Sequence, residues 1–230
     1  MKKIIILLIQ IIFILPSLAQ EEASEINSIN NTRQGFGRHE AFDMGVGYVN
    51  PKTKTEGSAY YFDDWNTEGI IYIKDKGRYK IKKVNLNLYN NKLEAIYDEN
   101  SVFTFNSENL IKIIIDNKVF RIFKIDKELK IFELFFNDKI SIYRYYSVLY
   151  SKGSKNPMHN RKTNKYIKKT KYYLYREGNL TKMKLSKNSF SKLFQSDKVS
   201  QQTIVKYIDN YELTLNKETD LIKVLNFVTK

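Results

Sequence analysis

Apolar and polar residues alternate along most of the region from residue 57 to residue 150. Ile71 and Ile73 are separated by one residue, as are Val84, Leu86 and Leu88. A period of two is typical of β-strands that bury one face. The chain is also rich in Tyr, Phe and Ile, which favour pleated surfaces over helices. The pattern predicts about eight strands.

Short polar pairs separate several of these apolar runs and mark tight turns. Asn and Asp adopt left-handed backbone conformations at low cost, and Gly does so freely. We therefore predict antiparallel hairpins, since parallel strands need long crossover connections. The predicted turns are Asn90-Asn91, Asp116-Asn117, Asn137-Asp138 and Glu177-Gly178.

After Leu185 the apolar period changes to that of an α-helix. Three stripes indicate two or three short amphipathic helices, which are marginal alone and are expected to dock on the sheet. Ser186, Ser200 and Asn216 are the expected N-caps. The stripes are Phe190, Leu193 and Phe194, then Ile204, Val205 and Ile208, then Leu221, Ile222, Leu225 and Val228.

These patterns predict an α+β fold that is mainly antiparallel β. The β domain spans residues 57–184 and forms a sandwich or a partly closed barrel. The helical tail spans residues 185–230 and packs on that domain.

The N-terminus has the layout of a secretory signal peptide over residues 1–19. A cationic start precedes an apolar run, Ile4–Leu15, and a small residue, Ala19, closes the segment. The run is shorter than the roughly 20 apolar residues that cross a bilayer. We expect cleavage between Ala19 and Gln20 and export to the periplasm, the cell surface or the extracellular space.

Residues 20–56 have little apolar periodicity and are predicted to form a flexible lead with one short strand near residues 44–49. The chain contains no Cys. It therefore has no disulfide, no thiolate metal site and no Cys for lipid attachment. We expect no transmembrane anchor in the mature protein.

The positive charge of the chain is concentrated in one segment. The whole chain has a formal net charge of +14, and residues 152–187 contain twelve Lys or Arg residues against Glu177 alone. Within it, residues 151–170 lack apolar periodicity, which predicts a long basic loop. The candidate binding residues are Arg161, Lys162, Lys165, Tyr166, Lys168, Lys169 and Lys171.

Two interpretations of this segment stay open. Clustered cations with interleaved Tyr rings favour a phosphate- or carboxylate-rich polymer. Charge runs are also common on solvated loops and faces. Because export separates the protein from nucleic acid, an anionic envelope or extracellular component is the expected partner if the segment binds one.

Residues with catalytic chemistry are sparse. His39 lies in the lead and His159 in the basic segment, and neither has a partner His at helical spacing. Asp63-Asp64 is the best carboxylate pair, but neighbouring strand residues point to opposite faces, so a polar turn before a Trp65 anchor is the alternative. We find no hydrolase, metalloprotease, nucleotide or dinucleotide motif, and predict no cofactor or metal.

Tyr143, Tyr145, Tyr146 and Tyr150 fall in one predicted strand. They either line a sugar-binding face or divide between the core and its rim, since Tyr packs its ring and keeps its hydroxyl hydrated.

The stretch Gly57–Trp65 (GSAYYFDDW), followed by Gly69–Lys74 (GIIYIK), resembles the start of a family of uncharacterised exported proteins from Bacteroidota-type bacteria. The resemblance continues in the helical end, at Ile204–Ile208 and Asp220–Leu225. It implies location and architecture, and it carries no activity and no functional residues.

Three functions follow as hypotheses. The first is a non-enzymatic exported binding protein that contacts an anionic component through the basic segment. The second is a hydrolase acting on glycans or lipids, with Asp63 or Asp64 contributing. The third is a structural or accessory subunit of an envelope complex.

Overall fold

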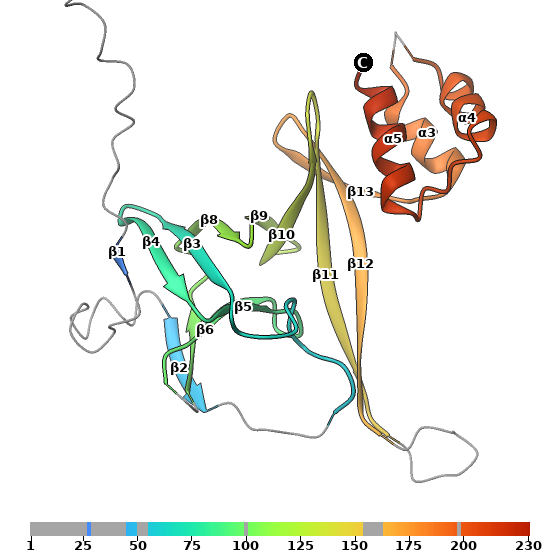
Figure 1. Ribbon diagram of the computed structural model, residues 1–230. Coiled ribbons are helices and arrows are strands. Elements are labelled where there is room, and N and C mark those ends of the chain that lie inside the picture. Colours follow the sequence, from blue (N-terminus) through green and yellow to red (C-terminus); the bar gives the residue numbers. More distant parts are fainter. Residues whose placement is uncertain (1–26, 29–44, 50–54, 99–100, 154–162, 197–198) are drawn as a thin grey trace, which may run out of the picture.

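The chain forms two β-sheets followed by three helices (Figure 1). The structure is a computed structural model. It describes residues 27–28, 45–49, 55–98, 101–153, 163–196 and 199–230. Nearly all strand pairs are antiparallel, and the sheets do not close into a barrel, so the predicted mainly antiparallel fold with C-terminal helices is confirmed as a sandwich.

The larger sheet has nine strands in the order β1-β4-β3-β8-β9-β10-β11-β12-β13. Among the pairs of described strands, only β1·β4 is parallel. The strands are β1 (Asn27–Ser28), β3 (Glu68–Ile73), β4 (Gly77–Lys82), β8 (Leu110–Ile115), β9 (Lys118–Ile125), β10 (Glu128–Asn137), β11 (Ser141–Ser151), β12 (Lys165–Arg176) and β13 (Asn179–Met183).

The smaller sheet has four strands in the order β2-β7-β6-β5. Its strand β2 is the short strand predicted near residues 44–49. The two sheets enclose a core of side chains such as Ile71, Leu93, Phe105 and Phe120, each at most 1% exposed. The strands are β2 (Gly45–Val49), β5 (Val84–Asn87), β6 (Lys92–Ile96) and β7 (Ser101–Phe105).

Three of the four predicted turns are present where the sequence placed them, and the fourth is shifted to residues 138–140, because Asn137 still pairs with Ser141 at the end of β10. Asn91, Asp116, Asn117 and Glu177 have positive φ angles between 49° and 59°. Asn and Asp adopt this left-handed region more readily than other residues with a side chain. The hairpins β5–β6, β8–β9, β10–β11 and β12–β13 are therefore confirmed.

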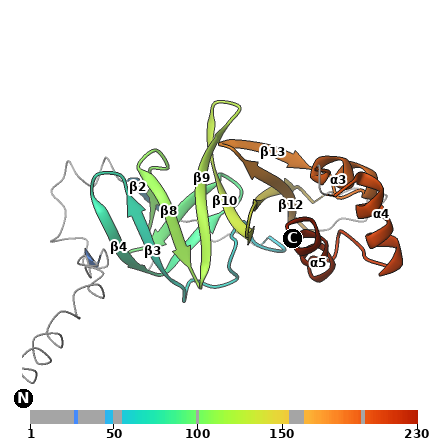
Figure 2. The ribbon, with the colours of Figure 1, turned by 90° about the horizontal axis from the view of Figure 1, so that it is seen from above.

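Three helices follow the last strand, as the stripes predicted: α3 (Lys187–Phe194), α4 (Gln201–Asn210) and α5 (Glu218–Val228). They lie together at one end of the molecule (Figures 1 and 2). Their buried side chains form a second core with Ile142 of β11 and Leu174 of β12. No helix in the described part of the chain is long and apolar enough to cross a membrane.

The predicted helix caps are partly correct. Ser200 caps α4 by accepting a hydrogen bond from the Thr203 amide at 3.2 Å. Ser186 occupies the N-cap of α3 without a side-chain cap bond. The N-cap of α5 is Lys217, one residue after the predicted Asn216.

The two halves of strand β10 pair with different strands. It pairs with β9 over residues 128–133 and with β11 over residues 133–137. The turn end of the β9–β10 hairpin, at residues 126–132, is therefore not paired with β11. Figure 2 shows this turn end lying beside the start of β13.

Candidate functional site

Residues 165–170 lie in strand β12 and Ser151 lies in β11, which corrects these parts of the loop predicted over residues 151–170. Strand β11 reaches Ser151 and β12 begins at Lys165, and the two pair in unbroken register from Ser141↔Tyr175 to Ser151↔Lys165. The prediction failed because lysines replace the apolar residues that normally reveal a strand. The backbone ladder to β11 supplies the hydrogen bonds that hold residues 165–170 in strand geometry.

Alternation along β12 divides the predicted binding residues between two faces. We call the face that carries Tyr166 the inner face, because Tyr166 packs against the sandwich core. Lys168 lies on the inner face, and its Nζ is 3.4 Å from the Tyr61 carbonyl oxygen. Lys165, Lys169 and Lys171 lie on the opposite, outer face.

The four lysines Lys165, Lys168, Lys169 and Lys171 are all exposed. Within the described ranges, none of them makes an ion pair with a carboxylate. On the outer face, Lys165, Lys169 and Lys171 border an exposed apolar cross-strand pair, Leu149 and Ile167, which are 51% and 40% exposed. This surface combines uncompensated cations with apolar contact area.

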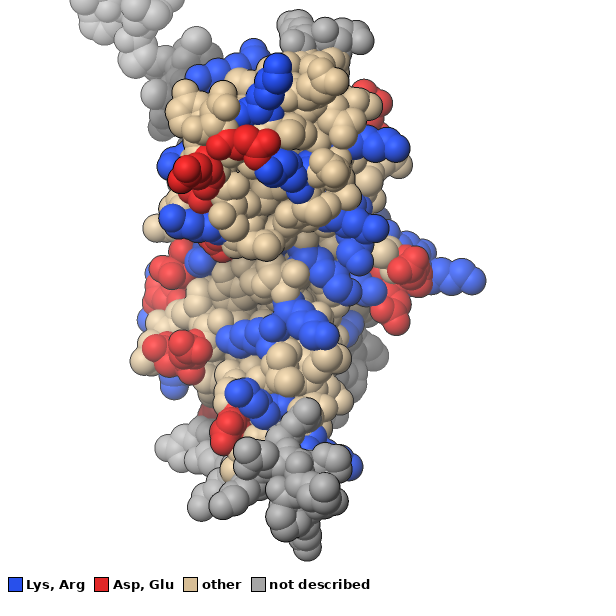
Figure 3. Space-filling view, turned by 90° about the vertical axis from the view of Figure 1, so that its right-hand side faces the viewer, with Lys and Arg blue, Asp and Glu red and all other residues tan. Residues whose placement is uncertain are grey.

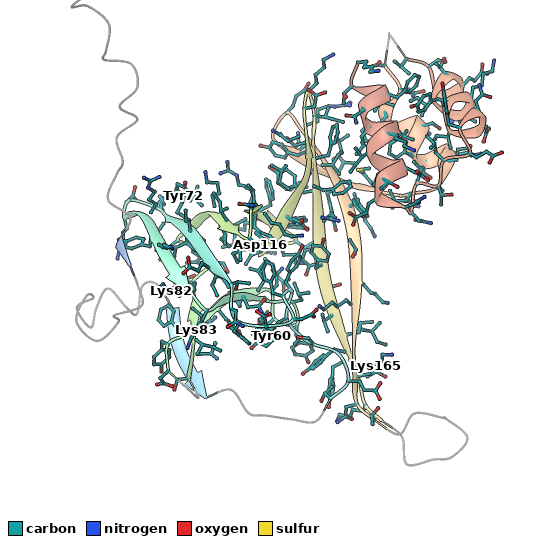
Figure 4. All side chains as sticks on the ribbon, in the orientation of Figure 1. Tyr60, Tyr72, Lys82, Lys83, Asp116 and Lys165 are labelled. Atoms are coloured by element: carbon teal, nitrogen blue, oxygen red, sulfur yellow. The ribbon has the colours of Figure 1, made fainter. Side chains whose placement is uncertain are left out.

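The basic strand lies on the side of the molecule that faces the viewer in Figure 3. That view shows Lys and Arg side chains over the middle of the side, with most acidic side chains towards its margins. Figure 4 places Lys165 at the lower end of the β11–β12 hairpin. The cations therefore form an extended band instead of a closed pocket.

Arg161, Lys162 and His159 lie outside the described residues, as do His39, Ala19 and Gln20. The described candidate surface therefore consists of the β12 residues.

An aromatic cluster occupies the outer face beyond the lysines, at the C-terminal end of β12. The Phe132 ring is fully buried there, with its centroid 5.2 Å from the rings of both Tyr145 and Tyr173. Phe123 of β9 lies 5.4 Å from Tyr175 of β12, although two strands separate β9 from β12 in the sheet order. The β9–β10 hairpin thus folds over the outer face and closes a small core.

A shallow cleft opens where this hairpin meets β13. It has a volume of about 580 Å³, and Phe123 and Tyr173 form its apolar walls. Lys124, Asp126 and Lys182 supply its charges. The described lining therefore carries charges of both signs.

The four predicted tyrosines divide between faces. Tyr145 and the buried Tyr143 belong to the outer aromatic cluster, where burial raises the pKa of Tyr143. Tyr146 points into the inner core, and Tyr150 lies at the rim, 38% exposed. The division between core and rim is therefore correct, and the four do not form one sugar-binding face.

A buried ionic network that the sequence did not reveal lies on the inner face. Glu133 is 3% exposed and accepts hydrogen bonds from Arg144 at 2.8 Å, Tyr146 at 2.6 Å and Tyr61 at 3.1 Å. Lys118 lies 3.8 Å from the same carboxylate. Only the spacing of charged residues within apolar strands hints at this network in the sequence.

The network perturbs the acidities of its members. Burial, followed by the hydrogen bond and charge of Glu133, raises the pKa of Tyr146. Burial works to lower the pKa of Arg144, but the hydrogen bond and charge of Glu133 outweigh it and raise that pKa. The raised pKa values keep the Tyr146 phenol and the Arg144 guanidinium protonated near neutral pH, and the hydrogen bonds of both groups to Glu133 connect β11 to β10.

Asp63 and Asp64 lie in a polar bend before β3, as the alternative interpretation of this pair predicted. Both side chains are exposed, and the Asp64 carboxylate accepts a hydrogen bond from the Asn66 amide at 2.8 Å. Trp65 packs edge-on against Tyr60, and Tyr60 forms a β-bridge with Asn87 of the small sheet. Tyr60 is labelled in Figure 4. No group of three metal-ligating side chains occurs among the described residues.

Comparisons with known protein families, with curated proteins and with solved structures gave no match. The resemblance to exported Bacteroidota-type proteins therefore stays a prediction.

Proposed function

We propose that this is an exported, non-enzymatic binding protein that contacts an anionic envelope or extracellular polymer through the basic part of β12. The observation that carries the proposal is the set of four exposed lysines on one strand without ion-pair partners in the described part of the chain. Unpaired surface cations keep their potential available for a ligand.

The surroundings of these lysines support contact with a polymer. Lys165, Lys169 and Lys171 repeat every second to fourth residue along an extended strand, whose rise is about 3.3 Å per residue. Acidic groups repeated along a polymer chain match such a row. Leu149 and Ile167 offer apolar contact between the charges.

Export supports an envelope or extracellular partner. The signal-peptide layout of residues 1–19 directs the chain away from cytoplasmic nucleic acid. Phosphorylated lipids and acidic glycans are the anionic components that such a protein meets.

Retention on a heparin column tests the proposal. We expect the triple variant Lys165→Gln, Lys169→Gln and Lys171→Gln to elute at clearly lower salt than the wild type, since screening governs exposed charge contacts. The matched control removes the same number of positive charges from the helical tail, by changing the exposed residues Lys192, Lys206 and Lys217 to Gln. Equal shifts for both triple variants would show that net charge alone causes retention, and would reject β12 as the binding surface.

A further inference from the structure

The edge of β12 is open in the middle of the strand. At one end, Lys165 forms a parallel bridge with Glu56, and at the other end the β13 ladder begins at Tyr172↔Met183. Between these two neighbours, no described strand pairs with the edge opposite β11. We call residues 167–171 on this side the open edge.

The backbone direction at the open edge follows from its two ends. The Tyr166 amide donates to the Glu56 carbonyl at 2.9 Å, so the backbone groups of Tyr166 point away from β11. Every second residue of a strand presents its N–H and C=O to the same edge. The amide and carbonyl groups of Lys168 and Thr170 therefore point outward, and no backbone partner within the described ranges meets them.

The side chains beside the open edge are suited to one kind of incoming strand. Lys168, Lys169, Thr170 and Lys171 are all exposed, so both faces of this stretch are accessible. Lysines at an edge disfavour pairing with a second copy of the same edge, because like charges would face each other. The same lysines attract a strand that carries carboxylates.

We infer that the open edge binds an extended acidic peptide segment of a partner protein as an added β-strand. The backbone of the segment pairs with Lys168 and Thr170, and its carboxylates at alternate positions lie opposite Lys169 and Lys171 on the outer face. The gap between Glu56 and Met183 limits the added strand to about five paired residues. This goes beyond the proposed function, because strand pairing requires a peptide backbone and not charge alone.

A single substitution at the open edge separates backbone pairing from charge. Thr170→Pro removes an outward N–H but none of the hydrogen bonds to β11, and proline is tolerated at edge positions of this kind. The probe is a fluorescent peptide with blocked ends, Glu-Thr-Glu-Val-Glu-Thr-Glu, titrated into the full chain. We expect Thr170→Pro to weaken peptide binding about tenfold or more, and Thr170→Ala, which keeps the N–H, to change it less than about twofold.

A modified peptide tests the same pairing without changing the protein. Two analogues are N-methylated at alternate residues, one in each of the two possible registers. We expect one of them to bind at least about tenfold more weakly than the parent peptide, because one set of amides must face β12. Equal binding of both analogues, or no saturable binding of the parent peptide, would overturn the inference.

Heparin retention of Thr170→Pro distinguishes the two proposals. We expect it to equal that of the wild type, because the lysines are unchanged. Retention without peptide binding overturns this inference and leaves the proposed function in place. If the wild type is not retained on heparin but binds the peptide, and Thr170→Pro weakens that binding, the proposed function is overturned and this inference stays in place.

Discussion

Arg144 and Glu133 form a buried ion pair across neighbouring strands, with Nη2 of Arg144 2.8 Å from Oε1 of Glu133. The same guanidinium donates a hydrogen bond to Glu218 in the first turn of α5. Its plane also lies over the Phe135 ring, 4.5 Å from the centroid. One side chain therefore connects the inner face of the large sheet to the helical end.

Loss of the Arg144 charge should be costly. In the variant Arg144→Met, Glu133 stays buried without its main partner, and we expect the free energy of unfolding to fall by about 3–5 kcal/mol. Urea unfolding measures the change. The matched control is Glu218→Gln, because Glu218 is half exposed and its loss leaves the Arg144–Glu133 pair intact. For that control we expect the free energy of unfolding to fall by less than about 1 kcal/mol. Equal losses for the two variants would contradict the central role of Glu133.

Alkaline pH should destabilise the protein through Tyr146. Its folded-state pKa lies above the ordinary value of about 10, because burial and Glu133 both disfavour the phenolate. Above pH 10 the unfolded chain releases this proton while the folded protein keeps it, so stability falls as pH rises. We expect Tyr146→Phe to flatten the decline in unfolding free energy above pH 10. Tyr211→Phe is the control at a tyrosine that is 66% exposed, and identical slopes for the two variants would refute the prediction.

The outer aromatic cluster should contribute strongly to stability. We expect Phe132→Ala to lower the free energy of unfolding by about 3–5 kcal/mol, because it removes a fully buried ring that three other aromatic rings contact. Near-ultraviolet circular dichroism should also weaken. Tyr97→Ala, at a ring that is 47% exposed, is expected to change stability by only about 0.5 kcal/mol. A small effect at Phe132 would show that the β9–β10 hairpin does not pack on β12.

The two serine N-caps should differ in their contribution. Ser200→Ala removes the hydrogen bond to the Thr203 amide and is expected to destabilise the protein by about 1 kcal/mol. Ser186→Ala removes no side-chain cap bond, so its effect should be smaller. Thermal unfolding of the two variants under the same conditions provides the comparison. A larger effect at Ser186 would contradict the assigned caps.

Expression in a secreting bacterial host should give a mature chain that begins at Gln20. The small residue Ala19 and the apolar run before it are the features that signal peptidase recognises. Intact mass and N-terminal sequencing of the exported fraction measure the cleavage site. Ala19→Arg should block cleavage and leave the precursor at the membrane, whereas an exported chain that still begins at Met1 would contradict the prediction.

Local sequence was enough to predict much of the fold. Turn pairs such as Asp116-Asn117 and the helical stripes identified hairpins and helices correctly, because turn geometry and amphipathic periodicity depend on neighbouring residues. The strand Gly77–Lys82 was not predicted separately, since charged residues occupy half of its positions. For the same reason, the sequence predicts a loop at residues 165–170, which form the first half of β12.

The candidate site depended more on tertiary structure. The sequence showed that the lysines cluster between residues 152 and 187, but only strand pairing divides them between two faces and leaves the edge at Lys168 and Thr170 open. The partners of Glu133 come from β9, β11 and the segment before β3, which no local pattern brings together.

The sequence by itself determined the mainly antiparallel β class, the short C-terminal helices and the position of the excess positive charge. These properties follow from residue type and spacing along the chain. Only the tertiary structure decided that residues 165–170 belong to strand β12, that Phe123 reaches Tyr175, and that Arg144 joins Glu133 to Glu218. The reason is physical, since burial, hydrogen-bond pairing and strand edges are set by residues far apart in the sequence.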